Sequence, residues 1–519
     1  MDIKKKFTYK VAAIVALGGL LMGFDASVIS GVNKFVQIDF ELTDLQLGFS
    51  VSSLTIIAAL AMMAAGPLSD KYGRRLLLKY CAVVFTISAV GSALAPNFTL
   101  FLIFRMLGGI GVGASLILAP MFIAEVAPPA SRGKLVSFNQ LNIVIGISLA
   151  FFSNYLILSF ADSDSSWVES LGVAEYNWRW MLGVEAVPAI AYFFGLYAVP
   201  RSPRWLVMKK REDEARKVMQ KFVSEEQAEE DIVSVRNSLK TKDNKKTPVT
   251  ELLKPAFRLV LTIGLVIGVL QQITGINSVF FYAPMIFEQS GIGTDASFIQ
   301  AILVGLTNLI FTILAMALID KLGRKPLLII GVSGIAIFMF LLAYGFNSAT
   351  YKLEKQNIEM LSEGVDKEAL YLLDGQSFAN DVIYKDKLRE VLGDIEAKTY
   401  ESELITAAIT MNPTLILIGI IGFVASFAIS LGPVMWVLFS ELFPLKIRGV
   451  AISVVGFANS AVSAGVQWVF PWELSTIGSS ATFLIYGILA FVGLAFIIMK
   501  LPETKGRTLE ELESILVKK

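Results

Sequence analysis

Three charged residues lie within stretches of the sequence that are otherwise apolar and long enough to cross a lipid bilayer. Asp25 is the only charge between Val11 and Asn33. Arg105 and Glu185 lie in two further apolar stretches. An ionised group in hydrocarbon costs at least ~2.5–3.5 kcal/mol, so it normally faces a partner or a water-filled cavity. These residues are therefore candidates for ion pairing or for proton transfer.

The spacing of the three charges predicts that they share one depth in the membrane. Each lies eight residues from an asparagine near a loop, namely Asn33, Asn97 and Asn177. Eight residues of helix correspond to roughly 12 Å. One interpretation is a structural ion pair that locks the first helices together. The other is a proton site, in which a carboxylate is protonated when it is desolvated and ionised when it meets Arg105.

The composition is that of a membrane protein. The chain has 519 residues, of which 55% are hydrophobic and 17% are charged, and its net charge of +1 gives no reason to expect nucleic acid binding. It has no histidine and a single cysteine, Cys81. Histidine metal sites, Ser–His or Cys–His catalysis and an intrachain disulfide are therefore excluded. No nucleophile–base pair is evident in the apolar stretches, so we expect no enzyme, no metal and no cofactor.

Twelve stretches are long enough to span a bilayer, which needs about 20 apolar residues in a helix. They cover residues 9–32, 45–68, 76–95, 98–123, 134–160, 178–199, 256–285, 295–319, 326–346, 413–440, 447–471 and 480–501. Basic residues gather in alternate short loops, around 71–75, 132–134, 321–325 and 446–448. Positive charge marks the cytoplasmic side. Both termini and segment 200–255 are therefore predicted to be cytoplasmic.

The two halves of the chain repeat one another. DKYGRR at 70–75 recurs as DKLGRK at 320–325, an offset of 250, and EVAPPASRG at 125–133 recurs as ELFPLKIRG at 441–449, an offset of 316. The difference between 316 and 250 is 66 residues, which matches a polar stretch at 346–411. Parallel repeats of this kind place a substrate site near the midplane between the halves.

This repeat predicts the organisation of the chain. We expect an N-terminal six-helix half, a cytoplasmic helical linker, a C-terminal six-helix half with an external insert between spans 9 and 10, and a cytoplasmic tail. Their ranges are 1–199, 200–255, 256–501 with the insert at 346–411, and 502–519. Within these parts, KTKDNKKTP at 240–248 is expected to be flexible and 384–409 to form an amphipathic helix.

Nine motifs in order make the chain resemble the sugar porter family of the major facilitator superfamily, closest in pattern to bacterial proton-coupled, xylose-type symporters. They include GFDASVISG (23–31), RMLGGIGVG (105–113), PRSPRWL (200–206), QQITGINSVFFYAP (271–284), GPVMWVLFSELFPLKIRG (432–449) and PETKGRTLEE (502–511). The resemblance implies an all-α fold of twelve transmembrane helices that imports a monosaccharide by alternating access. Because proton-coupled members carry aspartate where this chain has Asp25, it also implies proton symport through Asp25, with Arg105 and Glu185 as partners.

The expected sugar site is rich in side-chain amides. A neutral polyol needs groups that both donate and accept hydrogen bonds, and an aromatic plate for its ring face. By resemblance, the substrate-binding residues are Gln140, Gln271, Gln272, Asn277, Asn308, Trp436 and Asn459. The possible pocket walls are Phe24, Phe281 and Phe427. A lone amide in a membrane helix that binds no ligand commonly forms a hydrogen bond to a neighbouring helix. This is our interpretation of Asn142.

The pattern departs from the family in two places. Ile147 stands where xylose-type members carry a second glutamine, and Ser460 follows Asn459 where many members carry tryptophan. Both changes remove pocket contacts, so they bear on the identity of the sugar more than on transport itself.

The repeated charged motifs predict a gate on the cytoplasmic side. Ion pairs among them would hold that side shut and break when it opens. The alternative is that the basic residues only set topology, but topology needs no acidic partners at matching offsets. The expected gate residues are Asp70, Arg74, Arg75, Glu125, Arg132, Asp320, Arg324, Glu441 and Arg448.

Two other functions stay open on the sequence alone. One is a facilitative sugar uniporter in which Asp25 is structural, and the other is a sugar sensor with a transporter fold. In each case the protein would lie in the plasma membrane, in contact with lipid, and we expect a monomer in a bacterial inner membrane. The coupling ion, where present, is the proton.

Overall fold

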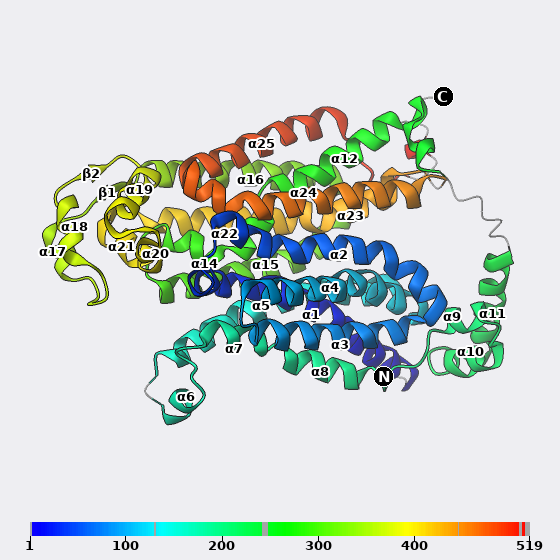
Figure 1. Ribbon diagram of the computed structural model, residues 1–519. Coiled ribbons are helices and arrows are strands. Elements are labelled where there is room, and N and C mark those ends of the chain that lie inside the picture. Colours follow the sequence, from blue (N-terminus) through cyan, green and yellow to red (C-terminus); the bar gives the residue numbers. More distant parts are fainter. Residues whose placement is uncertain are drawn as a thin grey trace. The chain divides into compact units, whose positions relative to one another are not determined.

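The computed structural model describes residues 3–128, 131–163, 165–240, 248–444, 446–507 and 511–513. Within these residues, eleven helices are long and apolar enough to cross a membrane. The remaining expected span, 178–199, is divided into α7 (Asn177–Gly183) and α8 (Ala186–Gly195) by a short turn. The fold is a twelve-span helical membrane protein (Figure 1).

The long helices follow the expected spans and extend a few residues beyond most of them. In the first part of the chain they are α1 (Ile3–Asp39), α2 (Asp44–Tyr72), α3 (Arg74–Ala93), α4 (Phe98–Val126) and α5 (Arg132–Ala161), with the short α6 (Ser166–Ser170) before α7. In the second part they are α12 (Arg258–Ile273), continued by α13 (Ile276–Phe281) and α14 (Ala283–Glu288), then α15 (Thr294–Leu322), α16 (Arg324–Asn347), α22 (Pro413–Ile429), α23 (Leu431–Leu442), α24 (Arg448–Thr476) and α25 (Ser479–Lys500).

The segment expected as a helical linker is helical. It contains α9 (Pro203–Met208), α10 (Glu212–Met219), α11 (Glu225–Lys240) and the 3-10 turns η2 (Val249–Leu253) and η3 (Pro255–Phe257). Ser202 caps α9 by accepting a hydrogen bond from Trp205 N, with Pro203 at the first helical position. Of the stretch expected to be flexible, residues 241–247 lie outside the described residues, as do 508–510 and 514–519 of the tail.

The chain forms two compact units. Unit 1 comprises residues 1–28, 53–150 and 179–246, and unit 2 comprises 29–52, 151–178 and 247–519. The ends of α1 and α5 and the start of α2 thus group with the second half of the chain. The boundary predicted at residue 199 by the sequence repeat stays a prediction.

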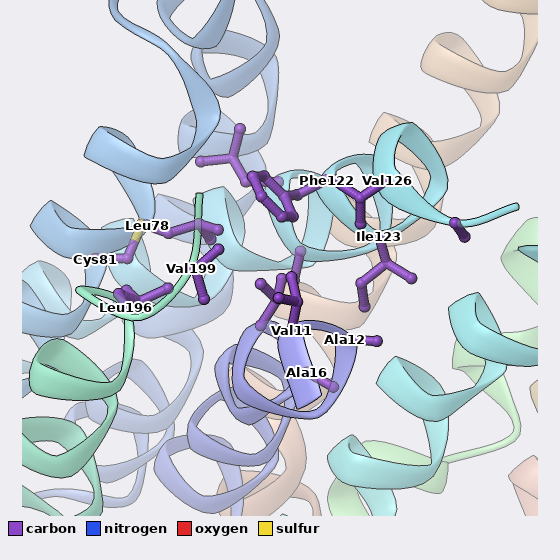
Figure 2. Packing of buried hydrophobic residues seen from close by; sticks show 14 of the residues in the cluster. Val11, Ala12, Ala16, Leu78, Cys81, Phe122, Ile123, Val126, Leu196 and Val199 are labelled. Carbon is purple, nitrogen blue, oxygen red and sulfur yellow. The ribbon is translucent and has the colours of Figure 1, made fainter. Parts of the chain in front are cut away.

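The core of unit 1 is built from side chains of several helices. Val11 and Ala16 of α1, Leu78 of α3, Phe122 of α4 and Val199, which follows α8, are all buried in one cluster (Figure 2). Burying a side chain of this size contributes about 1.5–3 kcal/mol when it leaves water. In a membrane the same surfaces are held mainly by close packing.

Glycines let α1 and α5 approach one another closely. A Cβ atom built on Gly23 of α1 would lie 2.0 Å from the carbonyl oxygen of Ile143 in α5. Reciprocally, a Cβ atom on Gly146 of α5 would lie 2.1 Å from the carbonyl oxygen of Leu20 in α1. Small residues at such crossings are typical of membrane helices, and here they bring the backbone around Asp25 close to α5.

The insert in unit 2 is a small folded body with its own core. It contains the strands β1 (Thr350–Lys352), β2 (Ser377–Phe378) and β3 (Ile409–Thr410) and the helical segments α17 (Lys355–Glu359), α18 (Lys367–Leu370), η4 (Tyr371–Leu373), α19 (Asp381–Leu392), α20 (Asp394–Thr399) and α21 (Glu401–Ala408). The strands pair antiparallel in the order β2-β1-β3. Buried Tyr351 and Tyr384 stack with ring centroids 5.4 Å apart.

The structure changes two expectations for the insert. Its three-stranded sheet was not predicted, because strands of two or three residues leave no periodicity in a sequence. The single amphipathic helix expected over 384–409 is divided into three. One division falls at Gly393, whose φ of +80° is a left-handed conformation that glycine adopts readily.

We predict that the α1–α5 crossing tolerates no added methyl group. Gly23→Ala or Gly146→Ala should lower the free energy of unfolding by about 1–3 kcal/mol, because backbone must move to make room. Thermal and SDS unfolding in detergent micelles measure the change. Gly465→Ala is the matched control, since among the described residues no heavy atom from outside its own stretch of helix lies within 4 Å of that Cβ position. Equal stabilities for all three variants would contradict the packing described.

Candidate functional site

The three charged residues predicted at one depth are brought together in unit 1. Arg105 Nη1 lies 2.5 Å from Asp25 Oδ1, and it also approaches the Asp25 carbonyl oxygen at 3.4 Å. All three side chains are almost completely buried, with Asp25 at 1% and Arg105 and Glu185 at 2% exposure. Glu185 interacts electrostatically with both of the others. The result is a buried ion pair of Asp25 and Arg105 with a second carboxylate, Glu185, close enough to feel both charges.

The cluster retains free hydrogen-bonding capacity. Among the described residues, Asp25 Oδ2, Glu185 Oε1 and Arg105 Nε have no hydrogen-bond partner. Gly108 of α4 makes room for the carboxylate, since a Cβ there would lie 2.6 Å from Asp25 Oδ2. A buried carboxylate oxygen without a partner is a position at which a proton can be held.

Each charge is positioned by a different local feature of the chain. Asp25 lies within the uninterrupted helix α1. Arg105 lies two turns into α4, which is capped by Asn97, whose side chain accepts a hydrogen bond from Leu100 N. Glu185 lies in the turn between α7 and α8. The interruption of this span at a buried carboxylate was not predicted.

Side-chain amides form a second cluster, in unit 2, at the interruption between α12 and α13. Gly275 ends α12 with a φ of +82°, so the chain turns between Gln272 and Asn277. Asn277 Nδ2 donates to Gln272 Oε1 at 2.8 Å, and Gln272 Nε2 donates to Gln271 Oε1 at 3.1 Å. Asn459 Nδ2 of α24 donates to Gln271 Oε1 at 2.8 Å. Four predicted residues thus form one continuous network.

The sequence analysis missed two members of this network. Ser463 Oγ accepts hydrogen bonds of 2.7 Å from both Asn277 Nδ2 and Gln467 Nε2. Both residues lie on the helix face of Asn459, at positions four and eight residues further along α24. That helical spacing from a predicted ligand was the signal that could have found them.

The other predicted sugar residues occupy varied positions. In unit 2, Asn308 is buried on α15, but among the described residues its side chain makes no hydrogen bond to the amide network. Trp436 on α23 is 45% exposed and packs edge-on against Phe439. The predicted wall residues Phe281 and Phe427 are buried.

Two of the predicted sugar-site residues, Gln140 and Phe24, belong to unit 1, whereas the amide network lies in unit 2. The hydrogen bonds of that network therefore do not test the roles of these two residues. Gln140 is exposed on α5. Phe24, which directly precedes Asp25 in α1, is buried. Asn142 bonds within its own helix, from Nδ2 to Phe138 O, rather than to another helix as expected.

Repeated ion-pair networks lie at one end of each unit. In unit 1, Arg74 Nη2 lies 2.8 Å from Asp70 and 3.1 Å from Glu125. Glu125 also accepts a hydrogen bond from Ser202 Oγ in the linker. The Arg74 and Glu125 side chains are buried, at 5% and 6% exposure, whereas Asp70 is 58% exposed, so the network reaches from the interior to the solvent.

Unit 2 repeats this arrangement. Arg324 lies 3.2 Å from Asp320 and 2.8 Å from Glu441, and Thr504 Oγ1 donates to Glu441 at 2.6 Å. Glu503 accepts hydrogen bonds from the backbone N–H groups of Arg324 and Lys325 at the start of α16. The roles of Ser202, Glu503 and Thr504 were not assigned from the sequence, although their motifs were noted.

The other three predicted gate residues bind backbone carbonyls. Arg75 donates to Leu196 O and Tyr197 O at 3.0 Å. Arg132 and Arg448 donate to Ala127 O and Phe443 O, just beyond the ends of α4 and α23. These cations therefore cap helix C-termini, where unsatisfied carbonyls accumulate.

Comparison with known proteins identifies similar chains along almost the whole length. The model of the family described as "Sugar (and other) transporter" matches residues 11–362 and 395–516. The D-xylose-proton symporter of Escherichia coli (strain K12) is 34% identical over 542 residues, covering 98% of this chain and 96% of that relative. The arabinose-proton symporter of Bacillus subtilis (strain 168) is 33% identical over 516 residues, covering 99% and 96%.

Solved structures give the same picture. The inward open conformation of the xylose transporter XylE from E. coli matches with a TM-score of 0.73 at 33% identity, covering 98% of this chain and 100% of that one. The proton:xylose symporter XylE bound to 6-bromo-6-deoxy-D-glucose matches with a TM-score of 0.70 at 32% identity, covering 99% and 100%.

Proposed function

The chain belongs to the Sugar (and other) transporter family, and on that premise we propose that it is a proton-coupled symporter that imports a monosaccharide by alternating access. The protein is a transporter rather than an enzyme. The similarity to D-xylose-proton and arabinose-proton symporters supports the proposal. The single observation that carries the coupling is the buried pair of Asp25 and Arg105.

The amide network is the proposed sugar site. Gln271, Gln272, Asn277 and Asn459 both donate and accept, so they can exchange hydrogen bonds among themselves for hydrogen bonds to sugar hydroxyls. We extend this site to Asn308, to Gln140 of α5 and to Trp436 as the aromatic plate. Phe24, Phe281 and Phe427 are its apolar walls.

Asp25 is the proposed proton carrier. When it faces the outer side it takes up a proton, its attraction to Arg105 weakens, and the halves close over the sugar. When it faces inward it releases the proton and pairs with Arg105 again. Moving without the proton would occlude an unbalanced charge, which costs several kcal/mol at low dielectric. Glu185 modulates this exchange because it competes for the same guanidinium.

The networks around Arg74 and Arg324 are the proposed inner gate, and Arg75, Arg132 and Arg448 support it at helix ends. The basic residues of the neighbouring loops support a cytoplasmic position for this gate and for both termini. The insert is then external. The lipid-facing protein functions as a monomer in the inner membrane, with the monosaccharide and the proton as its partners.

A facilitative uniporter is the second candidate. The direct 2.5 Å contact of Arg105 with Asp25 is compatible with it, because a purely structural ion pair would make the same contact. The two candidates differ in whether the transporter accumulates sugar against its gradient.

We predict that the amides bind the sugar directly. Gln272→Ala or Asn277→Ala should weaken sugar affinity by about tenfold or more. Each substitution leaves hydroxyl groups of the buried sugar without a hydrogen-bond partner, which costs ~1–3 kcal/mol of binding free energy. Titration calorimetry with D-xylose, L-arabinose and D-glucose measures the affinity. Asn142→Ala is the matched control, since in the described part of the chain that amide bonds to Phe138 O of its own helix. Native affinity in both site variants would remove these residues from the site.

We predict that Asp25→Asn, which mimics the protonated form, separates coupling from transport. It should abolish sugar accumulation driven by an imposed proton gradient in proteoliposomes while sparing much of sugar counterflow at equal pH. Asp162→Asn, which removes an exposed carboxylate, should leave both assays unchanged. Continued uphill accumulation in Asp25→Asn would make Asp25 a structural charge. Absence of accumulation in the native protein would favour the uniporter.

A further inference from the structure

The insert is fastened to the second half of the chain at two places. Asp381 Oδ2 accepts hydrogen bonds of 2.9 Å from both N and Oγ of Ser479, at the start of α25. Glu401 Oε1 accepts a hydrogen bond of 2.9 Å from Gln289 Nε2, directly after α14, and lies 3.1 Å from Lys385 Nζ. Burial acts to raise the pKa of Glu401, but Lys385 and Gln289 outweigh it and hold that pKa below its ordinary value.

A third attachment joins the insert to the turn between α1 and α2. Lys398 Nζ of α20 donates to the carbonyl oxygen of Leu42 at 3.3 Å and lies 3.5 Å from Asp44 Oδ1. Asp44 is held in place by Gln37 Nε2 of α1, at 2.9 Å. Leu42 and Asp44 come from the first half of the sequence, and all of these residues lie in unit 2. The insert therefore bridges the two halves at this end of the molecule.

The same end carries direct contacts between α1 and the segment that follows the amide network. Lys34 Nζ lies 2.9 Å from Glu288 Oε1 of α14 and donates to Thr294 Oγ1 at 2.7 Å. Asn33 Nδ2 donates to Phe281 O at 2.8 Å, and this bond is buried. Glu288 and Gln289 are adjacent, so one holds α14 to α1 and the other holds it to the insert.

The way the insert is attached suits separation as a rigid body. Its interior is a separate apolar cluster that includes Tyr351, Leu353, Leu370, Tyr384 and Leu404. A cavity of about 540 Å³ lies beside Lys34, lined by side chains of the insert that include Asn357, Thr399, Tyr400 and Glu403. Discrete polar contacts around a cavity can be exchanged for hydrogen bonds to water at small net cost. Exposing an apolar core to water would cost much more.

We propose that the insert is an outer latch: Lys398 grips the α1–α2 turn, Glu401 grips α14, and together they favour the conformation in which the outer side is closed. This inference rests on the proposed function, because a transporter that works by alternating access must separate these ends. Contacts made in only one of two conformations shift the equilibrium toward it. The family model leaves residues 363–394 unmatched, so α19 and its Lys385 are additions to the family pattern.

The expected effect of releasing the latch is a modest change in populations. One hydrogen bond or exposed ion pair changes an equilibrium by about 2- to 10-fold. Lys398→Met keeps the length of the side chain but removes its charge and donors. It should populate the outward-open conformation about 2- to 10-fold more, and Asp44→Asn should shift the population in the same direction by a smaller factor.

The test measures the distance between the two halves directly. Spin labels at Leu45→Cys and Ile299→Cys occupy exposed positions on α2 and α15, in a Cys81→Ser background. Double electron–electron resonance should show a larger fraction of long distances in Lys398→Met. The matched control is Lys387→Met, which removes an exposed lysine of the same insert whose partner, among the described residues, is Glu390 of its own helix.

The proposal is overturned when Lys398→Met and Asp44→Asn both give the distance distribution of Lys387→Met. A variant that fails to fold is recognised by its elution profile, and the other variant then carries the test. The measurement needs neither sugar nor a proton gradient. Failure of the latch is therefore distinguishable from failure of the proposed symport, which is read from sugar accumulation.

Discussion

A charged pair buried where the chain crosses a membrane is the constraint on which the rest of the structure depends. Asp25 and Arg105 are almost inaccessible to solvent, so each compensates the buried charge of the other. Their contact requires α1 and α4 to lie close together, and Gly108 provides the space. Glu185 adds a second buried carboxylate that interacts electrostatically with both. Such a cluster is poised to change its bonding when one proton is added, and the proposed coupling uses that property.

The proposed sugar site differs, because its side chains are neutral. Its amides bond to one another across the interruption at Gly275, so these described residues keep hydrogen-bond partners without a ligand. A sugar has to replace these bonds with equally good ones, and specificity follows from how well its hydroxyls match. In the proposed mechanism the charges that couple the proton belong to unit 1 and the amides that recognise the sugar belong to unit 2, and alternating access links the two.

Much of this could be predicted from the sequence because its signals are local or repeated. Counting eight residues from three asparagines placed Asp25, Arg105 and Glu185 at one depth, and the structure brings them together. The repeated motifs likewise anticipated the pairs of Arg74 with Glu125 and Arg324 with Glu441.

What escaped prediction depends on contacts between distant segments or on very short elements. Ser463 and Gln467 belong to none of the recognised motifs. The structure joins them to the network because Ser463 accepts hydrogen bonds from both Asn277 and Gln467. Arg132 and Arg448 were expected to take part in ion pairs, but they donate to carbonyl oxygens at helix ends, which the composition does not reveal. The sheet of the insert joins residues as far apart as Tyr351 and Ile409 through strands too short to show a pattern.

Simultaneous recording of sugar entry and proton entry tests the central claim most directly. Proteoliposomes containing the native protein and an internal pH-sensitive dye receive external sugar, with valinomycin and potassium present to prevent a build-up of charge. The account predicts that the lumen acidifies as sugar enters, in a fixed ratio of protons to sugar. Sugar entry at the same rate with no change in internal pH would contradict it, because Asp25 would then carry no proton.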